Sequence, residues 1–286
     1  MRKIAITQRL IENDKYFEIR EALDINFSSL INKCGFLPII LPYDINFLNF
    51  FKTIDIHGVI FTGGNDLVTN YSNKLSLKRD QFEKKLLKFC IEESIPVIGI
   101  CRGMQLIADF FGCSFKKIDG HVNTRHNLKI NQLSKDSKYL KKISNVNSFH
   151  NYSIDKLSDQ LIISASDQKN EIEALEHVQH KIYGQMWHSE REYPVKKNEI
   201  NFIKNYFNEG IDDVIKIATK ASKVIMKSYE EGFKINLKGD DSPITTADLL
   251  SNQVITEELK KISNYPIISE ENPVKYHIRK NYKKYW

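Results

Sequence analysis

The chain has 286 residues, of which 41% are hydrophobic and 27% charged, and its formal net charge is +6 at pH 7. This composition is typical of a globular protein, and the length is sufficient for two domains. Basic residues are spread along the whole chain and form no run interleaved with aromatic residues, so we expect no nucleic-acid partner. No stretch approaches the ~18 apolar residues of a membrane span, and the short apolar run after Met1 predicts a β-strand in place of a signal peptide.

Strand-like and helix-like segments alternate through the first part of the chain. Strands are expected at residues 3–7, 37–41, 57–61 and 96–100, and helices at residues 17–33, 77–91 and 102–111. Gly112 is placed to cap the last of these helices. The alternation predicts an α/β fold with an open, mostly parallel sheet and helices on both faces.

The pattern changes after about residue 114. Short β-like segments are expected at residues 144–149, 161–164 and 182–186, and a helix follows at 195–207. The sequence Asn-Glu-Gly at 208–210 predicts a boundary near Gly210. Beyond it, helices are expected at 211–233 and 246–262 and a short strand at 266–268. We therefore predict two domains, residues 1–208 and residues 211–286, the second an incomplete α+β segment.

The four cysteines include no C-x-x-C pair and none with a histidine at zinc-ligand spacing. A reduced protein of the cytoplasm is the simplest interpretation. Cys34, Cys90 and Cys113 lie in apolar segments, which predicts buried thiols. Cys101 stands apart, because a glycine lies two residues before it and another two residues after it.

Cys101 lies in the segment PVIGICRGMQ at residues 96–105, where a buried strand runs directly into Gly-x-Cys-x-Gly and then a helix. Such a turn forces its central residue into strained geometry, and the flanking glycines relieve the crowding. The side chain then projects from the carboxyl edge of the sheet, at a helix N-terminus whose dipole favours a thiolate. The alternative is a buried cysteine between two tolerated glycines.

A thiolate that attacks an amide also needs a proton donor and a site for the oxyanion. His188 ends a predicted strand, and Glu190 is placed to hold the far nitrogen of its imidazole. Residues 62–64, Thr-Gly-Gly, follow another strand and can present backbone N–H groups beside Cys101, with the amide of Arg102 as a second donor. The alternative for His188 is an exposed histidine at a strand end.

Together these residues resemble the class I glutamine amidotransferase superfamily, and within it the γ-glutamyl-γ-aminobutyrate hydrolase-like, peptidase C26-type branch. The resemblance covers about residues 1–208 and implies a flavodoxin-like sheet with a nucleophile elbow. Besides the Cys101 and His188 segments, it rests on three motifs in the family's order: Ile6-Thr7-Gln8-Arg9, Phe61-Thr62-Gly63-Gly64-Asn65-Asp66, and Arg79-Asp80 with Glu83.

The resemblance also implies site residues. Cys101 is the nucleophile, His188 and Glu190 complete a triad, and the N–H groups of Gly64 and Arg102 hold the oxyanion. Substrate contacts are expected from five residues: Gly63, Gln105, Asn147, Ser148 and His150. Two positions depart from the family pattern, because His150-Asn151-Tyr152 replaces His-His-Gln and His188-Ser189-Glu190 replaces His-Pro-Glu.

The implied reaction is the hydrolysis of a γ-glutamyl amide in a small molecule through a glutamyl thioester, without a metal or organic cofactor. A nucleotide-linked phosphoramidate is one substrate that fits, with a place in surface-polysaccharide synthesis. Two alternatives are a glutaminase subunit that supplies ammonia to a separate synthase, and a non-catalytic interaction protein. His121 and His126 are expected to be exposed loop residues, and the alternative is that they face the same cleft.

Residues 211–286 resemble the start of a bacterial 3′(2′),5′-bisphosphate nucleotidase of the inositol-monophosphatase superfamily. The resemblance rests on KGDDSPITTAD at 238–248 and PIISEE at 266–271, and Glu270 matches a metal ligand of that family. Because two-metal chemistry needs several carboxylates, we predict no phosphatase activity from this segment and treat Glu270 as a vestigial ligand. A natural fusion, a truncated sequence or a frameshift would each leave this pattern.

Overall fold

The computed structural model describes all residues except 44, 72, 209–210, 233, 238–242, 263–264 and 283–284, and also leaves out the side chains of 211–212. The chain divides into two compact units, Met1–Phe207 and Asn208–Trp286. The predicted boundary at Gly210 lies outside the described residues.

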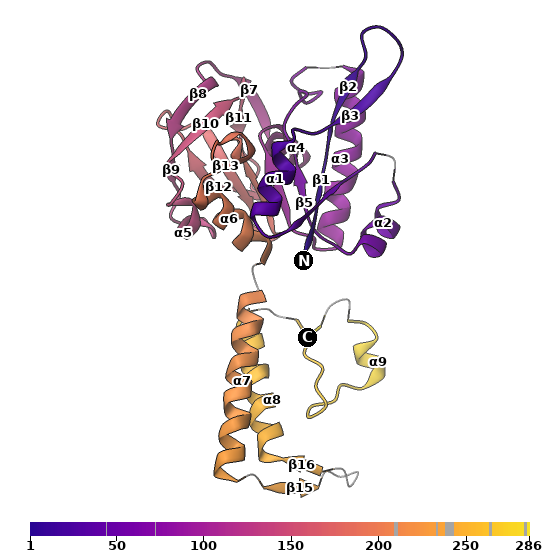
Figure 1. Ribbon diagram of the computed structural model, residues 1–286, viewed down its shortest axis with the longest axis vertical. Helices are drawn as coiled ribbons and strands as arrows, with labels where there is room; N and C mark the ends of the chain where they lie inside the picture. The colour runs from indigo at the N-terminus through magenta and orange to yellow at the C-terminus, as the bar shows by residue number, and fades with distance from the viewer. Residues whose placement is uncertain are drawn as a thin grey trace. The chain divides into compact units, whose positions relative to one another are not determined.

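An eight-stranded sheet forms the centre of the first unit (Figure 1). Five strands are parallel, in the order β4-β1-β5-β6-β14, and the remaining three continue the sheet antiparallel as β13-β12-β9. Their bounds are β1 Lys3–Ile6, β4 Leu37–Ile40, β5 Ile56–Phe61, β6 Val97–Ile100, β9 Lys129–Ile130, β12 Leu161–Ser166, β13 Ile172–His177 and β14 Ile182–Gln185. The parallel strands have the flavodoxin-like order 2-1-3-4-5, which confirms the predicted sheet.

Alternating side chains of the parallel strands enter two separate cores. Ile4 and Ile6 of β1 pack with α1 (Asn26–Lys33) and α6 (Lys197–Asn208). Ala5 faces the opposite side, where α2 (Phe47–Ile54), α3 (Lys74–Glu92) and α4 (Arg102–Phe110) supply the apolar contacts. Both faces of the sheet are therefore covered by helices, which explains why its strands read as nearly continuous apolar runs.

The first unit also contains smaller β-structures outside the central sheet. They are three antiparallel pairs: β2 (Arg9–Glu12) with β3 (Ile19–Ala22), β7 (Ser114–Lys117) with β11 (Tyr152–Lys156), and β8 (Val122–Asn127) with β10 (Asn145–Phe149). Two short helical segments, α5 (Ser137–Leu140) and η1 (Ser189–Arg191), complete this unit.

The predicted helix at residues 17–33 is wrong in its first half. Residues 19–22 form strand β3, and the helix begins only at Asn26. Asp24 sets this start, because its carboxylate accepts the N–H of Asn26 at 3.0 Å and its carbonyl accepts the N–H of Phe27 at 3.1 Å. The hairpin itself is held by Asn65, whose side chain bonds both the N–H and the carbonyl of Leu10 at 3.1 Å.

Strand β6, the turn at Cys101 and helix α4 pack unusually closely against β5. A Cβ atom placed on Gly103 would lie 2.2 Å from the carbonyl oxygen of Phe61. That neighbour is backbone and cannot give way, so only glycine allows the first turn of α4 to approach the sheet. The close approach brings the end of β5 next to the turn that carries Cys101.

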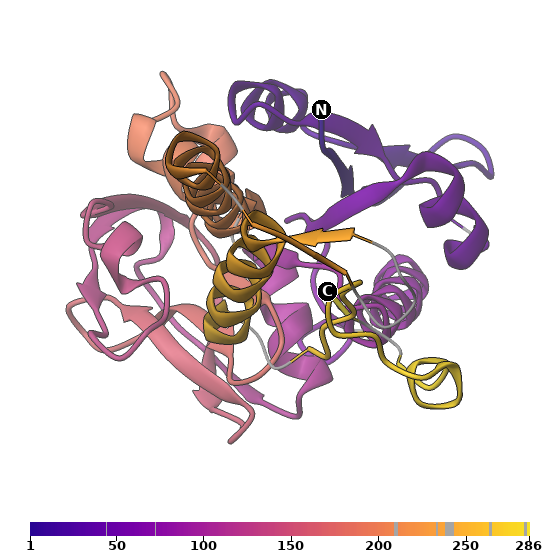
Figure 2. The ribbon, with the colours of Figure 1, turned by 90° about the horizontal axis from the view of Figure 1, so that it is seen from below.

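In the second unit, α7 (Ile211–Glu231) and α8 (Thr246–Ile262) lie side by side (Figures 1 and 2). The hairpin β15 (Ile235–Leu237) and β16 (Pro243–Thr245) connects them, and α9 (Tyr276–Arg279) follows. The predicted helices are present, although Phe233 and residues 238–242 of the predicted motif lie outside the described residues. The strand expected at 266–268 is not one: within the described residues, this segment exchanges two backbone hydrogen bonds with Trp286 and joins no sheet. Among the described residues, no helix combines the length and apolar character needed to cross a membrane.

Candidate functional site

The carboxyl ends of three neighbouring parallel strands carry polar residues that the sequence singled out. Strand β5 runs into Thr62, Gly63 and Gly64, strand β6 into Cys101, and strand β14 toward His188. Because parallel strands end at the same edge of a sheet, these segments meet there, as ligand sites in open α/β folds do.

Cys101 has a positive φ of 53° and a ψ of −109°, an unfavourable conformation for a residue with a side chain. Its N–H donates to the carbonyl of Gln185 at 2.7 Å, so the turn is tied to strand β14. The residue is the N-cap of α4, where the helix dipole favours a negative charge on sulfur. The strained conformation and the helix terminus predicted from Gly-x-Cys-x-Gly are therefore both present.

The imidazole of His188 lies between Cys101 and Glu190. Its Nδ1 is 2.5 Å from Oε1 of Glu190, and its opposite edge faces the thiol. Gly63 closes the gap between them: a Cβ atom there would lie 3.6 Å from Cβ of Cys101 and 3.7 Å from Nε2 of His188. All three side chains are less than one tenth exposed. The structure thus brings together a thiol, an imidazole and a carboxylate in this order.

The backbone around His188 is fixed from two sides. Asn147 of β10 accepts the N–H of His188 at 2.8 Å and donates to its carbonyl at 2.9 Å. From α6, Glu199 accepts hydrogen bonds from the indole of Trp187 at 3.1 Å and the hydroxyl of Ser189 at 2.7 Å. Because both neighbours of His188 are held, its imidazole has a fixed position relative to Cys101.

The charges of Cys101 and His188 are coupled. Burial alone would raise the pKa of Cys101, but the facing His188 imidazolium holds that pKa below the ordinary thiol value. Burial would lower the pKa of His188, whereas the thiolate of Cys101 and the carboxylate of Glu190 raise it well above the ordinary imidazole value. Each of these two charges therefore stabilises the other, the thiolate of Cys101 and the imidazolium of His188. Burial raises the pKa of Cys34 to about 12, so that thiol is inert.

Arg79 of α3 fixes residues 62–64, the segment that directly follows β5. Its guanidinium donates to the carbonyl of Thr62 at 2.8 Å, to that of Gly63 at 3.0 Å, and to that of Gly64. In a trans peptide the N–H points opposite to the preceding carbonyl. The N–H groups that follow these carbonyls, including that of Gly64, therefore point away from Arg79.

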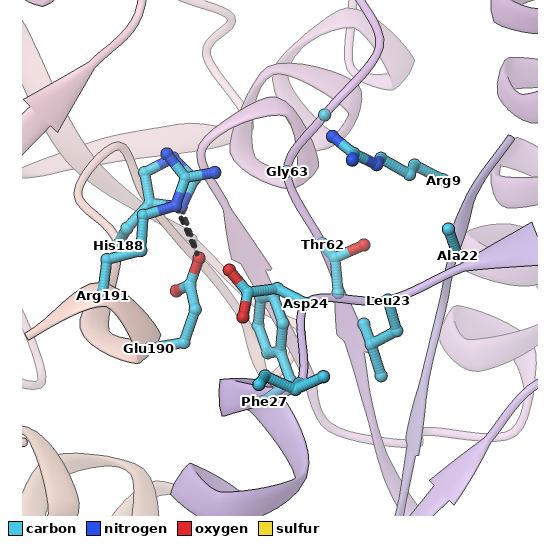
Figure 3. A pocket seen from close by; sticks show the side chains of 12 residues that line it. Arg9, Ala22, Leu23, Asp24, Phe27, Thr62, Gly63, His188, Glu190 and Arg191 are labelled. Carbon is cyan, nitrogen blue, oxygen red and sulfur yellow. Dashed lines mark hydrogen bonds and ion pairs between the residues drawn. The ribbon is translucent and has the colours of Figure 1, made fainter. Parts of the chain in front are cut away.

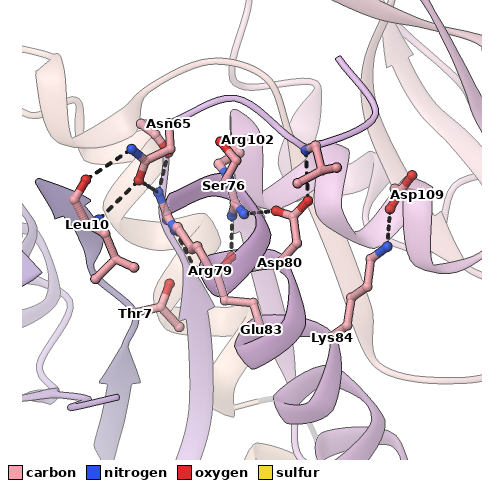
Figure 4. Close-up of polar contacts among 12 residues, drawn as sticks. Thr7, Leu10, Asn65, Ser76, Arg79, Asp80, Glu83, Lys84, Arg102 and Asp109 are labelled. Atoms are coloured by element: carbon pink, nitrogen blue, oxygen red, sulfur yellow. Dashed lines mark hydrogen bonds and ion pairs between the residues drawn. The ribbon is translucent and has the colours of Figure 1, made fainter. Parts of the chain in front are cut away.

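A buried ion network joins this loop to the turn at Cys101 (Figure 4). Arg79 pairs with Glu83 at 3.1 Å, and Arg102 pairs with both Glu83 and Asp80. Burial alone would raise the pKa of Glu83, but Arg102 and Arg79 hold it below the usual range. The second carboxylate oxygen of Asp80 accepts the N–H of Val68 at 2.9 Å. The Arg-Asp-x-x-Glu motif thus fixes both the loop after β5 and the first turn of α4 after Cys101.

Two cavities meet at Gly64. One of about 200 Å³ is lined by Cys101, Gln105, His150 and Tyr152 among others. The other, of about 300 Å³, contains the edge of His188 and Glu190 together with three charged residues: Arg9, Asp24 and Arg191. Figure 3 shows Arg9 on one side of the larger cavity and His188 with Arg191 on the other. The larger cavity contains two arginines and two carboxylates, Asp24 and Glu190, and the smaller one contains the thiol.

The predicted substrate contacts divide between these cavities and the protein interior. Gly63 and Gly64 line the larger cavity, while Gln105 and His150 line the smaller one. Two further predicted residues are buried and already bonded: Asn147 to His188, and Ser148 through its hydroxyl to the carbonyl of His121 at 2.8 Å. The structure does not bring these two side chains to either cavity.

Other expectations need correction or addition. His121 is not exposed but 4% accessible, and His126 is a half-buried residue of strand β8. The expectation of exposed loop residues is therefore wrong, because both histidines pack against Glu173 of β13. Glu270 is an exposed residue of the second unit. Sequence reasoning missed Arg191 as a cavity residue; its position directly after Glu190 was the available signal.

Comparisons with known proteins agree with this architecture. The sequence profile of the peptidase C26 family matches residues 4–190. The γ-glutamyl-CDP-amidate hydrolase of Campylobacter jejuni subsp. jejuni serotype O:2 is 40% identical over 208 residues, which are 72% of this chain and 97% of that protein. A crystal structure of a glutamine amidotransferase from Thermotoga maritima superposes with a TM-score of 0.51 at 15% identity, covering 73% of this chain and 84% of that one, and shows the same fold.

A separate similarity concerns a shorter part of the chain. The 3′(2′),5′-bisphosphate nucleotidase of Haemophilus influenzae is 37% identical over 78 residues, which are 27% of this chain and 29% of that protein. The chain therefore spans less than a third of the length of this relative.

The bonds that Arg79 makes to three carbonyls and to Glu83 predict an effect on stability. Lysine keeps the charge but has no planar fork, so Arg79→Lys cannot bond three carbonyls and Glu83 together. We expect the free energy of unfolding to fall by about 2–4 kcal/mol, measured by urea unfolding. Arg20→Lys is the control, since its side chain is 58% exposed and pairs with the surface groups Glu18 and Tyr16, and a change within about 0.5 kcal/mol is expected there. Equal effects of the two substitutions would contradict the supporting role.

Proposed function

Because the chain belongs to the peptidase C26 family and is a hydrolase of carbon–nitrogen bonds other than peptide bonds, we propose that it cleaves a γ-glutamyl amide through a thioester on Cys101. The observation that carries this proposal is the buried series of Cys101, His188 and Glu190 at the edge of the sheet. The name of the Campylobacter relative, a γ-glutamyl-CDP-amidate hydrolase, supports the γ-glutamyl bond as the one that is cleaved.

In the first half of the reaction, the Cys101 thiolate attacks the γ-carbonyl carbon and a C–S bond forms. The oxyanion that develops is held by the N–H groups of Gly64 and Arg102, of which the first points away from Arg79. The C–N bond then breaks, and the His188 imidazolium gives its proton to the leaving nitrogen. This step needs the imidazolium, which the pairing of His188 with Cys101 and Glu190 stabilises.

In the second half, neutral His188 takes a proton from water, and the resulting hydroxide attacks the thioester carbonyl. The C–S bond breaks, the thiolate returns to Cys101, and glutamate leaves. Glu190 keeps the imidazole in one orientation throughout, because its carboxylate holds Nδ1 at 2.5 Å. No proton is gained or lost by the protein over the whole cycle.

We infer that the leaving amine carries phosphate, as in a nucleotide-linked phosphoramidate. The larger cavity beside His188 contains the guanidinium groups of Arg9 and Arg191. Nε of Arg191 lies 3.7 Å from Oε1 of Glu190, and its Cζ lies 4.9 Å from the centre of the Phe149 ring. Arg9 has no ion pair within the described part of the chain. Guanidinium groups bind phosphate oxygens in a bidentate manner, which suits a diphosphate next to the scissile bond.

The first test is hydrolysis of a γ-glutamyl phosphoramidate ester and of a neutral γ-glutamyl alkylamide. Cys101→Ala removes the nucleophile, so we expect the rate to fall by at least about 10³-fold, while Cys34→Ala keeps it. Mass spectrometry of the quenched enzyme is expected to show a glutamyl adduct on the peptide that contains Cys101. Full activity of the alanine variant would sink the proposal. Ammonia release from glutamine that depends on an added partner protein would favour a glutaminase subunit instead.

The pKa directions generate a second test with iodoacetamide. The Cys101 thiolate exists at pH values below the ordinary thiol pKa, and protonation removes it only at lower pH. The alkylation rate of Cys101 is therefore expected to stay high from alkaline pH down through neutrality, without the drop below about pH 8.5 that a free thiol shows. His188→Ala removes the cation and is expected to move this drop upward in pH. If Cys101 and Cys34 react equally slowly at pH 7, no activated thiolate is present.

The two arginines of the larger cavity predict that their removal affects a phosphate-containing substrate more than a neutral one. Arg9→Gln and Arg191→Gln each remove one guanidinium, so kcat/KM for the phosphoramidate ester is expected to fall by about 10–100-fold. For the neutral alkylamide, a change of less than about threefold is expected. Lys116→Gln is the control, because this cation pairs with Glu171 outside both cavities. Equal losses on both substrates would mean that these arginines support the fold and do not bind phosphate.

A further inference from the structure

Four side chains outside the proposed triad converge on one point. His121 precedes strand β8, His126 lies within β8, His150 follows β10, and Glu173 belongs to β13. Glu173 is fully buried, and His150 and His121 are 3% and 4% exposed. One donor atom from each side chain lies within 4.8 Å of the others, which identifies the group as a possible ligand set for a metal ion.

The contacts within this cluster are longer than ordinary hydrogen bonds, and Nε2 of His121 also lies 3.4 Å from Oδ2 of Asp167. Oε1 of Glu173 lies 3.4 Å from Nε2 of His126, 3.4 Å from Nε2 of His150, and 3.6 Å from Nε2 of His121. Both oxygens of Glu173 and all three Nε2 atoms are buried without a hydrogen-bond partner in the part of the chain that the structure describes. Such a carboxylate is expensive to bury unless a charge compensates it.

The tautomers of two histidines show what kind of charge fits. Nδ1 of His150 lies 3.0 Å from the carbonyl of Tyr152, and Nδ1 of His121 lies 3.3 Å from that of Asp119. Because a carbonyl only accepts, each Nδ1 carries the proton, and in the neutral ring Nε2 presents a lone pair. Lone pairs that face a carboxylate oxygen repel it, and a cation between them removes this conflict. Backbone carbonyls that fix Nδ1 are the usual second contacts of metal-binding histidines.

The spacing also suits a small tetrahedral ion. Ligand atoms at about 2.0–2.1 Å from a zinc ion are separated from each other by about 3.3–3.4 Å. The distances from Glu173 to His126 and His150, both 3.4 Å, match this edge, and the distance to His121 is 3.6 Å. Imidazole suits zinc and its transition-metal neighbours, whereas magnesium and calcium prefer sets of oxygen atoms.

We propose that His121, His126, His150 and Glu173 bind one divalent transition-metal ion of the zinc type. Four protein ligands fill a tetrahedral site, so the ion is structural and takes no part in the cleavage step. It joins the β8–β10 pair to strand β13 of the central sheet. His150 also lines the cavity that contains Cys101, so the ion holds one wall of that cavity in place.

The test uses the full-length chain with Cys101→Ala, so that the thiolate and His188 cannot form a competing metal site. The protein is stripped with a chelator and titrated with Zn²⁺ alone in equilibrium dialysis. We expect one zinc ion per chain and a rise in Tm of about 5–10 °C at a hundredfold excess over the dissociation constant. Substitution by Co²⁺ is expected to give the strong visible absorption of a tetrahedral site. None of these readouts depends on hydrolytic activity.

Two ligand variants and one control complete the design. Glu173→Gln and His126→Ala are expected to weaken zinc binding by at least about 100-fold, whereas His180→Ala, which also removes one histidine near β13, binds zinc like the parent. His126 is the least buried ligand, with 14% of its side chain exposed, so its variant is informative even if Glu173→Gln does not fold. The proposal is overturned if the Cys101→Ala protein retains no zinc, or if both ligand variants bind it as tightly as His180→Ala.

Discussion

The buried pairing of two arginines with two carboxylates on helix α3 is the interaction on which the rest of the site depends. Arg79 holds three successive carbonyls after β5, and Arg102 holds the first turn of α4 immediately after Cys101. Glu83 touches both arginines, so the loop and the turn share one anchor. The network contains equal numbers of positive and negative groups, which lets it remain buried without a net charge. Its geometry turns the backbone N–H groups that follow these carbonyls away from Arg79.

The same edge of the sheet contains a second, coupled pair of charges. The thiolate of Cys101 is stabilised by its helix terminus and by His188, and His188 is stabilised in turn by Glu190. Neither group alone would remain ionised at such low exposure. Because Asn147 bonds both backbone groups of His188, the β8–β10 pair positions the proposed base beside the proposed nucleophile, Cys101, which the parallel strands carry. The proposed reaction site therefore lies where these two β-structures meet.

Local patterns in the sequence predicted the features that depend on local chemistry. A buried strand followed by Gly-x-Cys-x-Gly and a helix identifies the turn at Cys101. The flanking glycines leave room for a turn whose central residue has a positive φ. Contacts between distant segments carried no such signal. The role of Asn147 needs β10 to pack beneath His188, and the hairpin before residue 24 is fixed by Asn65 from another loop. The cluster around Glu173 was hidden for the same reason, because its ligands are separated by 5, 24 and 23 residues along the chain.

His150 links the proposed chemistry to the proposed ion. Its Nε2 faces Glu173, while its ring borders the cavity that contains Cys101. A proton on His150 would add a mobile positive charge beside the thiolate, one that changes with pH. An ion bound at Nε2 fixes that charge and also fixes the ring, because Nδ1 is already held by the carbonyl of Tyr152. With a metal ion in place of a proton, the charge and the position of His150 would not change with pH. His188 would then be the imidazole that exchanges protons in the proposed reaction.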